Sequence, residues 1–286
     1  MTGGAGSGRS GGGSRALVGL DGWPVPTAAA AVVGPDGVLA THGRVDHEFA
    51  LASVTKPLAA LAVLVAVEEE AVSLDDPADA DLLPGATLRH LLAHASGVAA
   101  DERRRERPPG DRRVYSNAGF ELAGDLVTRA TGIPFADYLR EAVFEPLGMR
   151  SSDLAGSPAH AGRSTVADLA HVVSELLAPS GLLGAATLTA LREVQFPGLR
   201  GVLPGYGGQS PNDWGLGFEL RGDKSPHWTG SHNSPATYGH FGQRGTMFWV
   251  DPEAGLALVA LADRDFGDWA RAAWPALADA VLAEFG

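Results

Sequence analysis

The chain has 286 residues, of which 45% are hydrophobic and 20% are charged, and these proportions are typical of a globular protein. Its net charge of −12 argues against nucleic acid as a partner, because binding phosphate requires a basic surface. The absence of cysteine excludes disulfides and thiolate metal sites.

The two kinds of segment that would tie the chain to a membrane are not predicted. Residues 1–14 are rich in glycine and serine, lack the apolar core of a secretory signal, and are expected to form a flexible tail. The longest apolar stretch, residues 58–67, is shorter than the roughly 20 residues that span a bilayer. We therefore expect a soluble, cytoplasmic protein that does not bind membranes.

The first part of the chain predicts strands followed by a helix. Residues 28–33 and 38–41 are apolar, a Gly-Pro-Asp-Gly turn separates them, and a third short strand is expected at 48–51. A helix should then run to about residue 70. Pro57 is tolerated only near a helix start, so this helix begins at the turn that holds Ser53.

The middle of the chain is expected to be mostly helical, and strands return near its end. Apolar residues at helical spacing predict helices at 88–95, 118–131, 134–143, 165–177 and 186–194. Later segments predict strands at 215–220, 238–241, 246–250 and 256–261. An amphipathic helix should close the chain at 267–285.

Strands at both ends and helices between them predict an α/β (α+β) fold. We expect one antiparallel sheet from residues 15–57 and 205–286, backed by the terminal helix, and a helical domain from residues 58–204 inserted in it. The cleft between the two parts is the natural place for a binding site.

Ser53 and Lys56 form the first candidate for chemistry. Three residues apart on a helix, they share one face, and the helix start favours negative charge near the serine. A serine hydroxyl needs a base, and a desolvated lysine can provide one. The chain has twenty arginines but only Lys56 and Lys224 as lysines, and an arginine is not deprotonated in proteins. The alternative is a helix cap beside a solvated lysine.

Five short motifs resemble those of one family. Residues 53–56 (SVTK) resemble the S-x-x-K motif of β-lactamases and penicillin-binding proteins. Residues 115–117 (YSN) resemble the Y-x-N motif of class C β-lactamases, D-alanyl-D-alanine peptidases and family VIII carboxylesterases. Residues 240–242 (HFG) resemble the H-x-G variant of their K-T-G strand, and residues 91–97 (LLAHASG) and 146–149 (PLGM) are similar to two further segments. The resemblance extends over about residues 25–285 and implies a β-lactamase/transpeptidase-like fold.

The resemblance implies a role for each matched residue. Ser53 is the expected nucleophile, and Lys56 and Tyr115 share the proton transfers, Tyr115 as a phenolate or as a hydroxyl coupled to the lysine. Substrate binding and the oxyanion hole are expected to involve Asn117, His240, Gly242, Gln243 and the amide of Ser53. Taken singly, Tyr115 fits a core tyrosine, Asn117 a cap for a helix that begins at residue 118, and His240 an ordinary strand histidine.

The departures from the K-T-G pattern bear on the substrate. His240 and Phe241 stand where a lysine and a threonine would offer a cation and a hydroxyl to a carboxylate. This favours a carboxylesterase acting on small neutral esters, with weak β-lactam hydrolysis, over an efficient β-lactamase. Acyl transfer, amide hydrolysis and D-amino-acid peptidase activity stay open, as does a non-catalytic sensor or binding module.

Two other features carry weaker predictions. The arginine-rich residues 102–113 are expected to form a solvated loop, because acidic residues are interspersed among the basic ones. His227, His232 and His240 match no zinc-binding spacing, so neither a metal nor another cofactor is expected.

Overall fold

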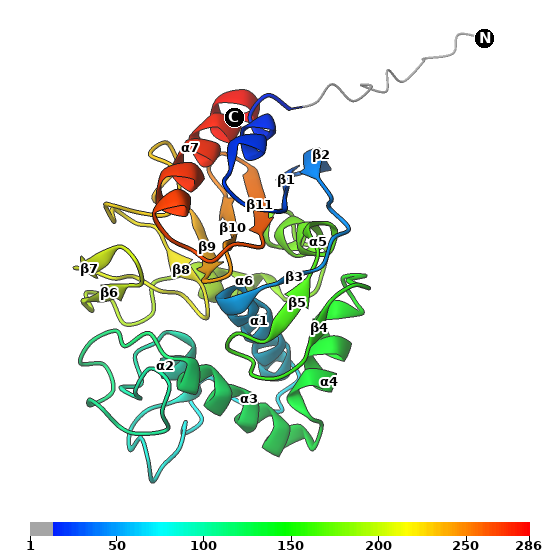
Figure 1. The fold of residues 1–286 in the computed structure, drawn as a ribbon. Helices are drawn as coiled ribbons and strands as arrows, with labels where there is room; N and C mark the ends of the chain where they lie inside the picture. Colours follow the sequence, from blue (N-terminus) through cyan, green and yellow to red (C-terminus); the bar gives the residue numbers. More distant parts are fainter. Residues whose placement is uncertain (1–13) are drawn as a thin grey trace.

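A computed structural model describes residues 14–286 of the chain (Figure 1). Its main sheet consists of β1 (Ala28–Gly34), β2 (Gly37–Gly43), β8 (Glu219–Leu220), β9 (Tyr238–Gly242), β10 (Thr246–Asp251) and β11 (Leu256–Ala262). The strands are antiparallel and lie in the order β2-β1-β11-β10-β9-β8. The predicted tail, residues 1–14, lies outside the described residues except for Ser14, whose hydroxyl donates to Glu284 at 3.1 Å.

The two ends of the chain meet in the middle of this sheet. β1 pairs with β11 in a register that runs from Ala28 opposite Ala262 to Val33 opposite Ala257. β11 in turn pairs with β10, and β10 with β9. This pairing confirms the predicted antiparallel sheet built from both ends of the chain.

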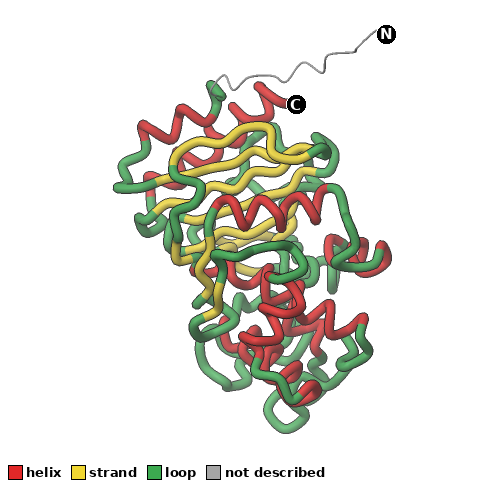
Figure 2. The backbone as a smooth tube through the Cα atoms, turned by 90° about the vertical axis from the view of Figure 1, so that its right-hand side faces the viewer, coloured by secondary structure: helices red, strands yellow, loops and turns green. Residues whose placement is uncertain are grey.

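Helices cover both faces of the sheet. The terminal helix α7 (Asp268–Phe285) and the 3₁₀ helix η1 (Leu17–Gly22) lie on one face, and α5 (Val166–Leu177) lies on the other (Figure 2). Successive side chains of a strand point to opposite faces, so Ala30 and Val32 pack with α7 while Ala29 and Ala31 pack with α5. Burial on both faces explains why these strands are apolar runs rather than alternating ones.

The remaining elements form a second, mainly helical part. They are η2 (Ala52–Val54), α1 (Thr55–Glu68), α2 (Leu88–Leu92), α3 (Asn117–Thr131), α4 (Phe135–Leu139), the π-helical turn η3 (Arg140–Phe144) and α6 (Ala185–Arg192). Short strands join them: β3 (Phe49–Ala50), β5 (Gly162–Ser164) and β4 (Asp153–Leu154) form one sheet, and β6 (Gly201–Leu203) and β7 (Gly207–Gln209) form a hairpin.

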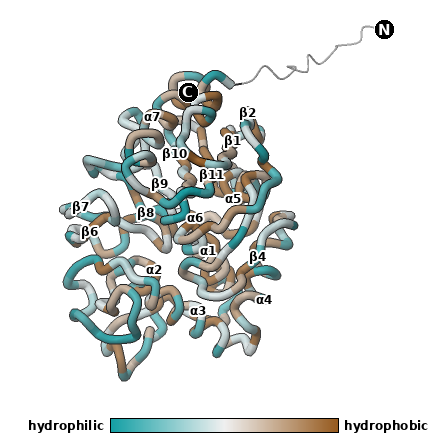
Figure 3. Tube along the Cα trace, in the orientation of Figure 1, coloured by the Kyte–Doolittle hydropathy of each residue, from teal (hydrophilic) through white to brown (hydrophobic). Residues whose placement is uncertain are grey.

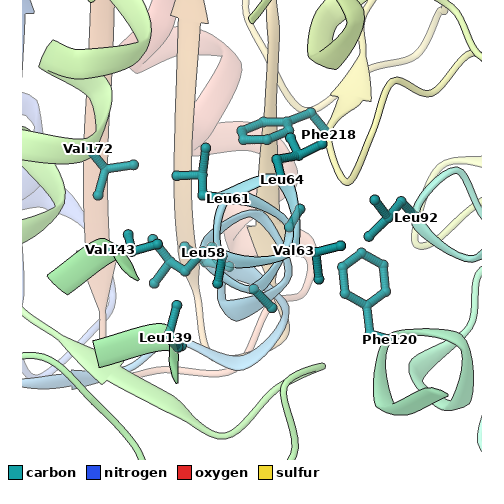
Figure 4. Packing of buried hydrophobic residues seen from close by; sticks show 14 of the residues in the cluster. Leu58, Leu61, Val63, Leu64, Leu92, Phe120, Leu139, Val143, Val172 and Phe218 are labelled. Atoms are coloured by element: carbon teal, nitrogen blue, oxygen red, sulfur yellow. The ribbon is translucent and has the colours of Figure 1, made fainter. Parts of the chain in front are cut away.

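The helix that follows Ser53 runs through the centre of the larger core. Leu58, Leu61, Val63 and Leu64 point to several sides of α1 and are each at most 1% exposed. Around them lie side chains from α2, α3, α4, η3, α5 and the segment before β8 (Figure 4). A helix that is apolar all round must be buried, and burying its start fixes the position of the catalytic candidates.

Two elements differ from the sequence-based expectation. The helix predicted at 165–177 is assigned by the sequence to the helical domain of residues 58–204, but the observed helix, α5, packs against β1, β10 and β11. The strand expected at 215–220 is reduced to β8, because Gly217 has a φ of +87° and Leu216 N donates to Leu191 O. A residue with positive φ interrupts an extended strand. The segment therefore docks on the end of α6 instead of extending the sheet.

Hydropathy follows this architecture. Hydrophobic residues are concentrated in the inner strands of the main sheet, such as β10 and β11, and in α1, and hydrophilic residues follow the loops beside α2 (Figure 3). Within residues 14–286, no helix combines the length and the apolar character needed to cross a bilayer.

Candidate active site

The turn that carries Ser53 has a constrained backbone. Ala52, which precedes it, has a φ of +46°, a conformation that non-glycine residues rarely adopt and that often marks a functional site. Thr55 Oγ1 donates to Ala52 O at 2.6 Å, and Thr246 Oγ1 of β10 donates to Leu51 O at 2.7 Å. These bonds join the turn to both the helix and the sheet. They hold Ser53 between α1 and the main sheet.

Lys56 lies beside Ser53 as the helical spacing predicts. Its Nζ is 3.2 Å from Ser53 Oγ, and it donates to Asn117 Oδ1 at 2.6 Å and to Ala159 O at 3.0 Å. The side chain is fully buried. Its nitrogen also lies 4.6 Å from the centroid of the Tyr115 ring. The structure thus brings together Ser53 and Lys56 from one stretch of the chain and Tyr115 and Asn117 from another.

Burial changes the proton affinity of this lysine. Desolvation lowers the pKa of Lys56 to about 7, although the charges of Asp101 and Glu121 act in the opposite direction. The three groups that its nitrogen contacts are a hydroxyl, an amide and a carbonyl, and none of them carries a charge. A large share of Lys56 is therefore unprotonated at neutral pH.

Tyr115 contributes a hydroxyl rather than a phenolate. Desolvation raises its pKa well above the ordinary value, while a hydrogen bond with Ser53 acts in the opposite direction. Of the two forms that the sequence left open, this environment favours the protonated hydroxyl. Such a group can relay a proton next to Ser53 without holding a negative charge.

Asn117 is not the helix cap that the alternative interpretation expected. The N-cap of α3 is Ser116, whose Oγ accepts from Gly119 N at 2.9 Å. The amide of Asn117 instead bridges Lys56 and Asp101, because its Nδ2 donates to Asp101 Oδ1 at 2.6 Å. Likewise, Ser53 makes no side-chain cap to α1, whose N-cap is Val54.

The end of β9 lies directly against the nucleophile turn. A Cβ on Gly242 would lie 2.4 Å from Leu51 O and 3.1 Å from Ser53 N, so only glycine fits there. Gly242, expected from the sequence to contribute to substrate binding and the oxyanion hole, thus makes its close approach to the turn of Ser53. It brings the following residue, Gln243, next to Ser53, and both line one cavity.

His240 lies in the same cavity and is neutral. Desolvation, together with the charge of Lys56, lowers its pKa to about 3. Its Nδ1 lies 2.6 Å from Phe241 O. The Phe241 side chain packs with Trp228 and Trp274 in the core beneath α7. The structure therefore agrees with the expectation that this strand offers neither a cation nor a hydroxyl at the two positions.

The cavity beside Ser53 is small and mainly apolar. Its volume is about 40 Å³, enough for a few water-sized groups. Its lining residues are Ser53, Tyr115, Leu203, Pro204, Trp214, Glu219, His240, Phe241 and Gln243. Leu203 comes from the β6–β7 hairpin, an element that the sequence did not predict. The hairpin therefore closes one side of the site.

His94, which positions Tyr115, was missed as a functional candidate. His94 is buried with a φ of +55°, accepts a hydrogen bond from Ser116 N at 3.1 Å, and has its ring centroid 4.6 Å from that of Tyr115. Trp214 packs edge-on against His94 at 4.5 Å. His94 belongs to the LLAHASG motif. The motif match therefore indicated this residue, but the sequence offered no reason to assign it a function.

Arg113 is a buried arginine that the sequence did not distinguish from its exposed neighbours. It ends the arginine-rich segment 102–113, but unlike Arg103 and Arg104, which form surface ion pairs, it is 2% exposed. Its guanidinium donates to backbone oxygens of Ala93 (2.8 Å) and Asn212 (3.0 Å), and also to those at 195 and 196. Arg113 therefore anchors the loop segment that leads to Tyr115, whereas the rest of residues 102–113 is solvated as expected.

The three late histidines lie in different surroundings. His227 Nε2 contacts Glu219 Oε2 at 2.8 Å, His232 is exposed beside Asp279, and His240 lines the cavity. Among residues 14–286, no three His, Cys, Asp or Glu side chains are grouped as a metal site would require.

Comparison with known proteins adds the family. The sequence model described as "Beta-lactamase" matches residues 21–283, which is most of the chain. The chain belongs to the Beta-lactamase family. This Beta-lactamase family member is 59% identical to a protein from Mycobacterium bovis whose crystal structure is described as a beta-lactamase. The two superimpose with a TM-score of 0.92 over 94% of this chain and 99% of the other.

Two curated relatives match parts of the chain. The chain is 28% identical over 139 residues to "Penicillin-binding protein 4*" of Bacillus subtilis, covering 38% of this chain and 31% of the relative. It is 25% identical over 159 residues to "D-alanyl-D-alanine-carboxypeptidase/endopeptidase AmpH" of Escherichia coli, covering 44% and 41%. The chain thus spans less than half the length of these two relatives. The family that the five motifs resemble and the fold class predicted from the sequence are therefore confirmed.

Proposed function

We propose that this Beta-lactamase family member is a serine hydrolase that forms an acyl-enzyme on small neutral esters, as a carboxylesterase does. One observation carries the proposal: Lys56 Nζ lies 3.2 Å from Ser53 Oγ in surroundings that lower the lysine pKa to about 7. An unprotonated amine at that distance can take the serine proton as the hydroxyl attacks.

Acylation then proceeds in two steps. Ser53 Oγ forms a bond to the ester carbonyl carbon while its proton passes to Lys56 Nζ. The amides of Ser53 and Gln243 donate to the developing oxyanion. The intermediate collapses by breaking the bond to the alkoxy oxygen, and Lys56 returns the proton to the leaving alcohol through the hydroxyl of Tyr115.

Deacylation repeats these steps with water as the nucleophile. Water gives its proton to Lys56 through Tyr115, attacks the acyl carbon, and releases the acid as Ser53 regains its proton. An alcohol or amine in place of water would make the same site an acyltransferase. Asn117 supports both half-reactions by holding Lys56 in place, and one N–H of its amide is left for the acyl part of the substrate.

The cavity supports a small, neutral acyl group. Its small volume, about 40 Å³, and its mainly apolar lining favour a short, uncharged acyl chain. Neutral His240 provides no charge for the carboxylate that β-lactams and peptide C-termini carry. We therefore expect β-lactam hydrolysis to be weak, and the amide hydrolase and D-amino-acid peptidase alternatives to be less favoured than the esterase.

The experiment that tests the proposal measures hydrolysis of p-nitrophenyl acetate and butyrate by the wild type and by Ser53→Ala. We expect Ser53→Ala to lose at least about 10³-fold in kcat/KM, because the nucleophile is gone. Ser73→Ala, a change of an exposed serine, is the matched control and should keep full activity. Equal rates in wild type and Ser53→Ala would contradict the proposal and favour a non-catalytic binding module.

A second measurement separates the substrate classes. Nitrocefin, an amide and a D-alanyl dipeptide are compared with the butyrate ester at equal enzyme concentration. The proposal predicts the highest kcat/KM for the ester. A nitrocefin rate that equals or exceeds the ester rate would instead identify a β-lactamase.

A further inference from the structure

The tautomer of His240 is fixed by the backbone. Its Nδ1 lies 2.6 Å from Phe241 O, and because a carbonyl oxygen only accepts hydrogen bonds, Nδ1 must carry the proton. In a neutral imidazole the other nitrogen is then an acceptor. His240 Nε2 is buried in a side chain that is 3% exposed, and among the described residues it has no hydrogen-bond partner.

The rest of the cavity wall offers no cation. Among residues 14–286, no lysine or arginine lines the cavity. In the described part of the chain, Glu219 is the only charged residue of the lining. Lys224 contacts one of its carboxylate oxygens, and His227 and Trp228 contact the other. Where His240 forms this wall, the buried polar atom left without a partner among the described residues is therefore an acceptor, and the carboxylate of Glu219 belongs to the same wall.

We propose that His240 Nε2 accepts a hydrogen bond from a hydroxyl or amide N–H of the substrate, so that the site selects esters carrying such a donor over unsubstituted and anionic esters. The inference rests on the proposed esterase function and names its substrate class. The polarity of the contact is the reverse of that in the K-T-G pattern. A lysine at this position would donate to an acceptor on the substrate, whereas His240 accepts from a donor.

The charges around His240 keep it an acceptor. Lys56 and the apolar surroundings disfavour its protonation, and Glu219, which favours protonation, is already paired with Lys224. With its pKa lowered to about 3, the imidazole stays neutral throughout the pH range in which Lys56 is unprotonated. A substrate donor therefore meets the same group whenever the enzyme is active.

A buried acceptor left without a partner makes an ester that lacks the donor a poorer substrate. A site built around one hydrogen bond discriminates against the analogue that cannot form it by about tenfold or more. A carboxylate at the same place meets a lone pair and a nearby anion, and it should be disfavoured at least as strongly.

The test uses pairs of esters that differ only in the donor. On the acyl side, p-nitrophenyl β-hydroxybutyrate is compared with p-nitrophenyl β-methoxybutyrate. On the alcohol side, hydroxyethyl butyrate is compared with methoxyethyl butyrate in a pH-stat. In at least one pair, we expect wild-type kcat/KM to favour the hydroxyl compound by about tenfold. Equal values in both pairs would overturn the inference.

Variants assign the preference to one residue. His240→Leu removes the acceptor and should bring the ratio close to one, whereas His232→Leu, which changes an exposed histidine, should keep the wild-type ratio. His240→Lys restores a cation and should raise the relative rate on p-nitrophenyl hemisuccinate. A hydroxyl preference that survives in folded His240→Leu or His240→Lys would also overturn the inference.

Binding separates this inference from the proposed function. Calorimetry with Ser53→Ala measures the affinity for the hydroxyl and methoxy esters of each pair without turnover. If the wild type hydrolyses no ester but Ser53→Ala still prefers the hydroxyl compound, the proposed reaction fails and the recognition by His240 stands. If turnover occurs but neither rate nor affinity distinguishes the pairs, the recognition fails and the reaction stands.

Discussion

The two lysines of the chain are both buried but have different partners. Lys56 Nζ contacts Ser53 Oγ, Asn117 Oδ1 and Ala159 O, so no carboxylate touches it. Lys224 Nζ contacts the carboxylate of Glu219 and donates to Asp213 O at 2.8 Å. One buried amine thus lies among neutral groups, and the other is half of an ion pair.

This difference decides what each lysine can do. Desolvation lowers the pKa of Lys56 to about 7, because its contacts do not compensate a positive charge. At the second position, the carboxyl pKa of Glu219 is lowered: burial acts to raise it, but His227 and Lys224 together outweigh that effect. The first arrangement yields a base for catalysis, and the second yields a structural ion pair beneath the substrate cavity.

The largest effect expected from this comparison is the loss of activity in Lys56→Met. Replacing the amine by an apolar chain of similar length removes the proton acceptor of Ser53, and kcat/KM for p-nitrophenyl butyrate should fall by about 10³-fold. The fold should persist, because methionine suits a buried helix position. Circular dichroism and thermal unfolding provide the check. A folded variant within tenfold of the wild type would show that Lys56 is not the base.

The matching change at the other lysine should affect stability instead. Lys224→Met leaves the buried carboxylate of Glu219 without its cation, so the free energy of unfolding should fall by about 3 kcal/mol. Urea denaturation measures this fall. In the double variant Lys224→Met/Glu219→Gln the uncompensated charge is gone, and part of the loss should be recovered. A Lys224→Met protein as stable as the wild type would contradict the distinction between the two lysines.

The next prediction concerns stability as a function of pH. The pKa of Lys56 is about 7 in the folded protein, whereas the ordinary value of 10.5 applies to the unfolded chain. Between these two pH values the unfolded chain therefore binds more protons than the folded protein. Wild-type stability relative to Lys56→Met should therefore rise with pH across that window, by up to about 1.4 kcal/mol per pH unit. Lowering the pH toward 7 should correspondingly reduce the stability of the wild type relative to Lys56→Met. Urea denaturation of both proteins at several pH values measures the difference, and parallel curves would contradict it.

The smallest expected effect is a shift of the pH profile in Asp101→Asn. The carboxylate of Asp101 raises the pKa of Lys56 through its charge and also holds Asn117. Asparagine keeps a hydrogen-bond acceptor but removes the charge, so the acid limb of kcat/KM should move to lower pH by about half a unit. Asp111→Asn, on the same loop, should leave the limb in place. A change of rate without a shift would reduce Asp101 to a purely structural role.

The sequence predicted the sheet and the central motifs because they depend on local patterns. The apolar runs that became β1, β10 and β11 are separated by recognisable turns, and the position of Pro57 places the start of α1, at Thr55, directly after the turn that holds Ser53. The short spacing between Ser53 and Lys56 also fixes their distance, because both lie within one helical turn.

The rest of the site depends on packing between distant segments. Tyr115 reaches Lys56 only because α3 docks on α1, and Arg113 differs from its neighbours only because backbone oxygens from three other segments converge on it. Strands of two or three residues, such as those of the β6–β7 hairpin, show no periodicity. The tautomer of His240 likewise follows from a backbone carbonyl and not from its motif.

The most direct test of the central claim is the titration of Lys56 by NMR. Lysine labelled with carbon-13 at the ε position gives signals from only two side chains in this protein, and the signal missing in Lys56→Met assigns the catalytic one. The account predicts that this signal titrates with a midpoint near pH 7. A midpoint near the ordinary value of 10.5 would show that Lys56 stays charged at neutral pH and cannot activate Ser53.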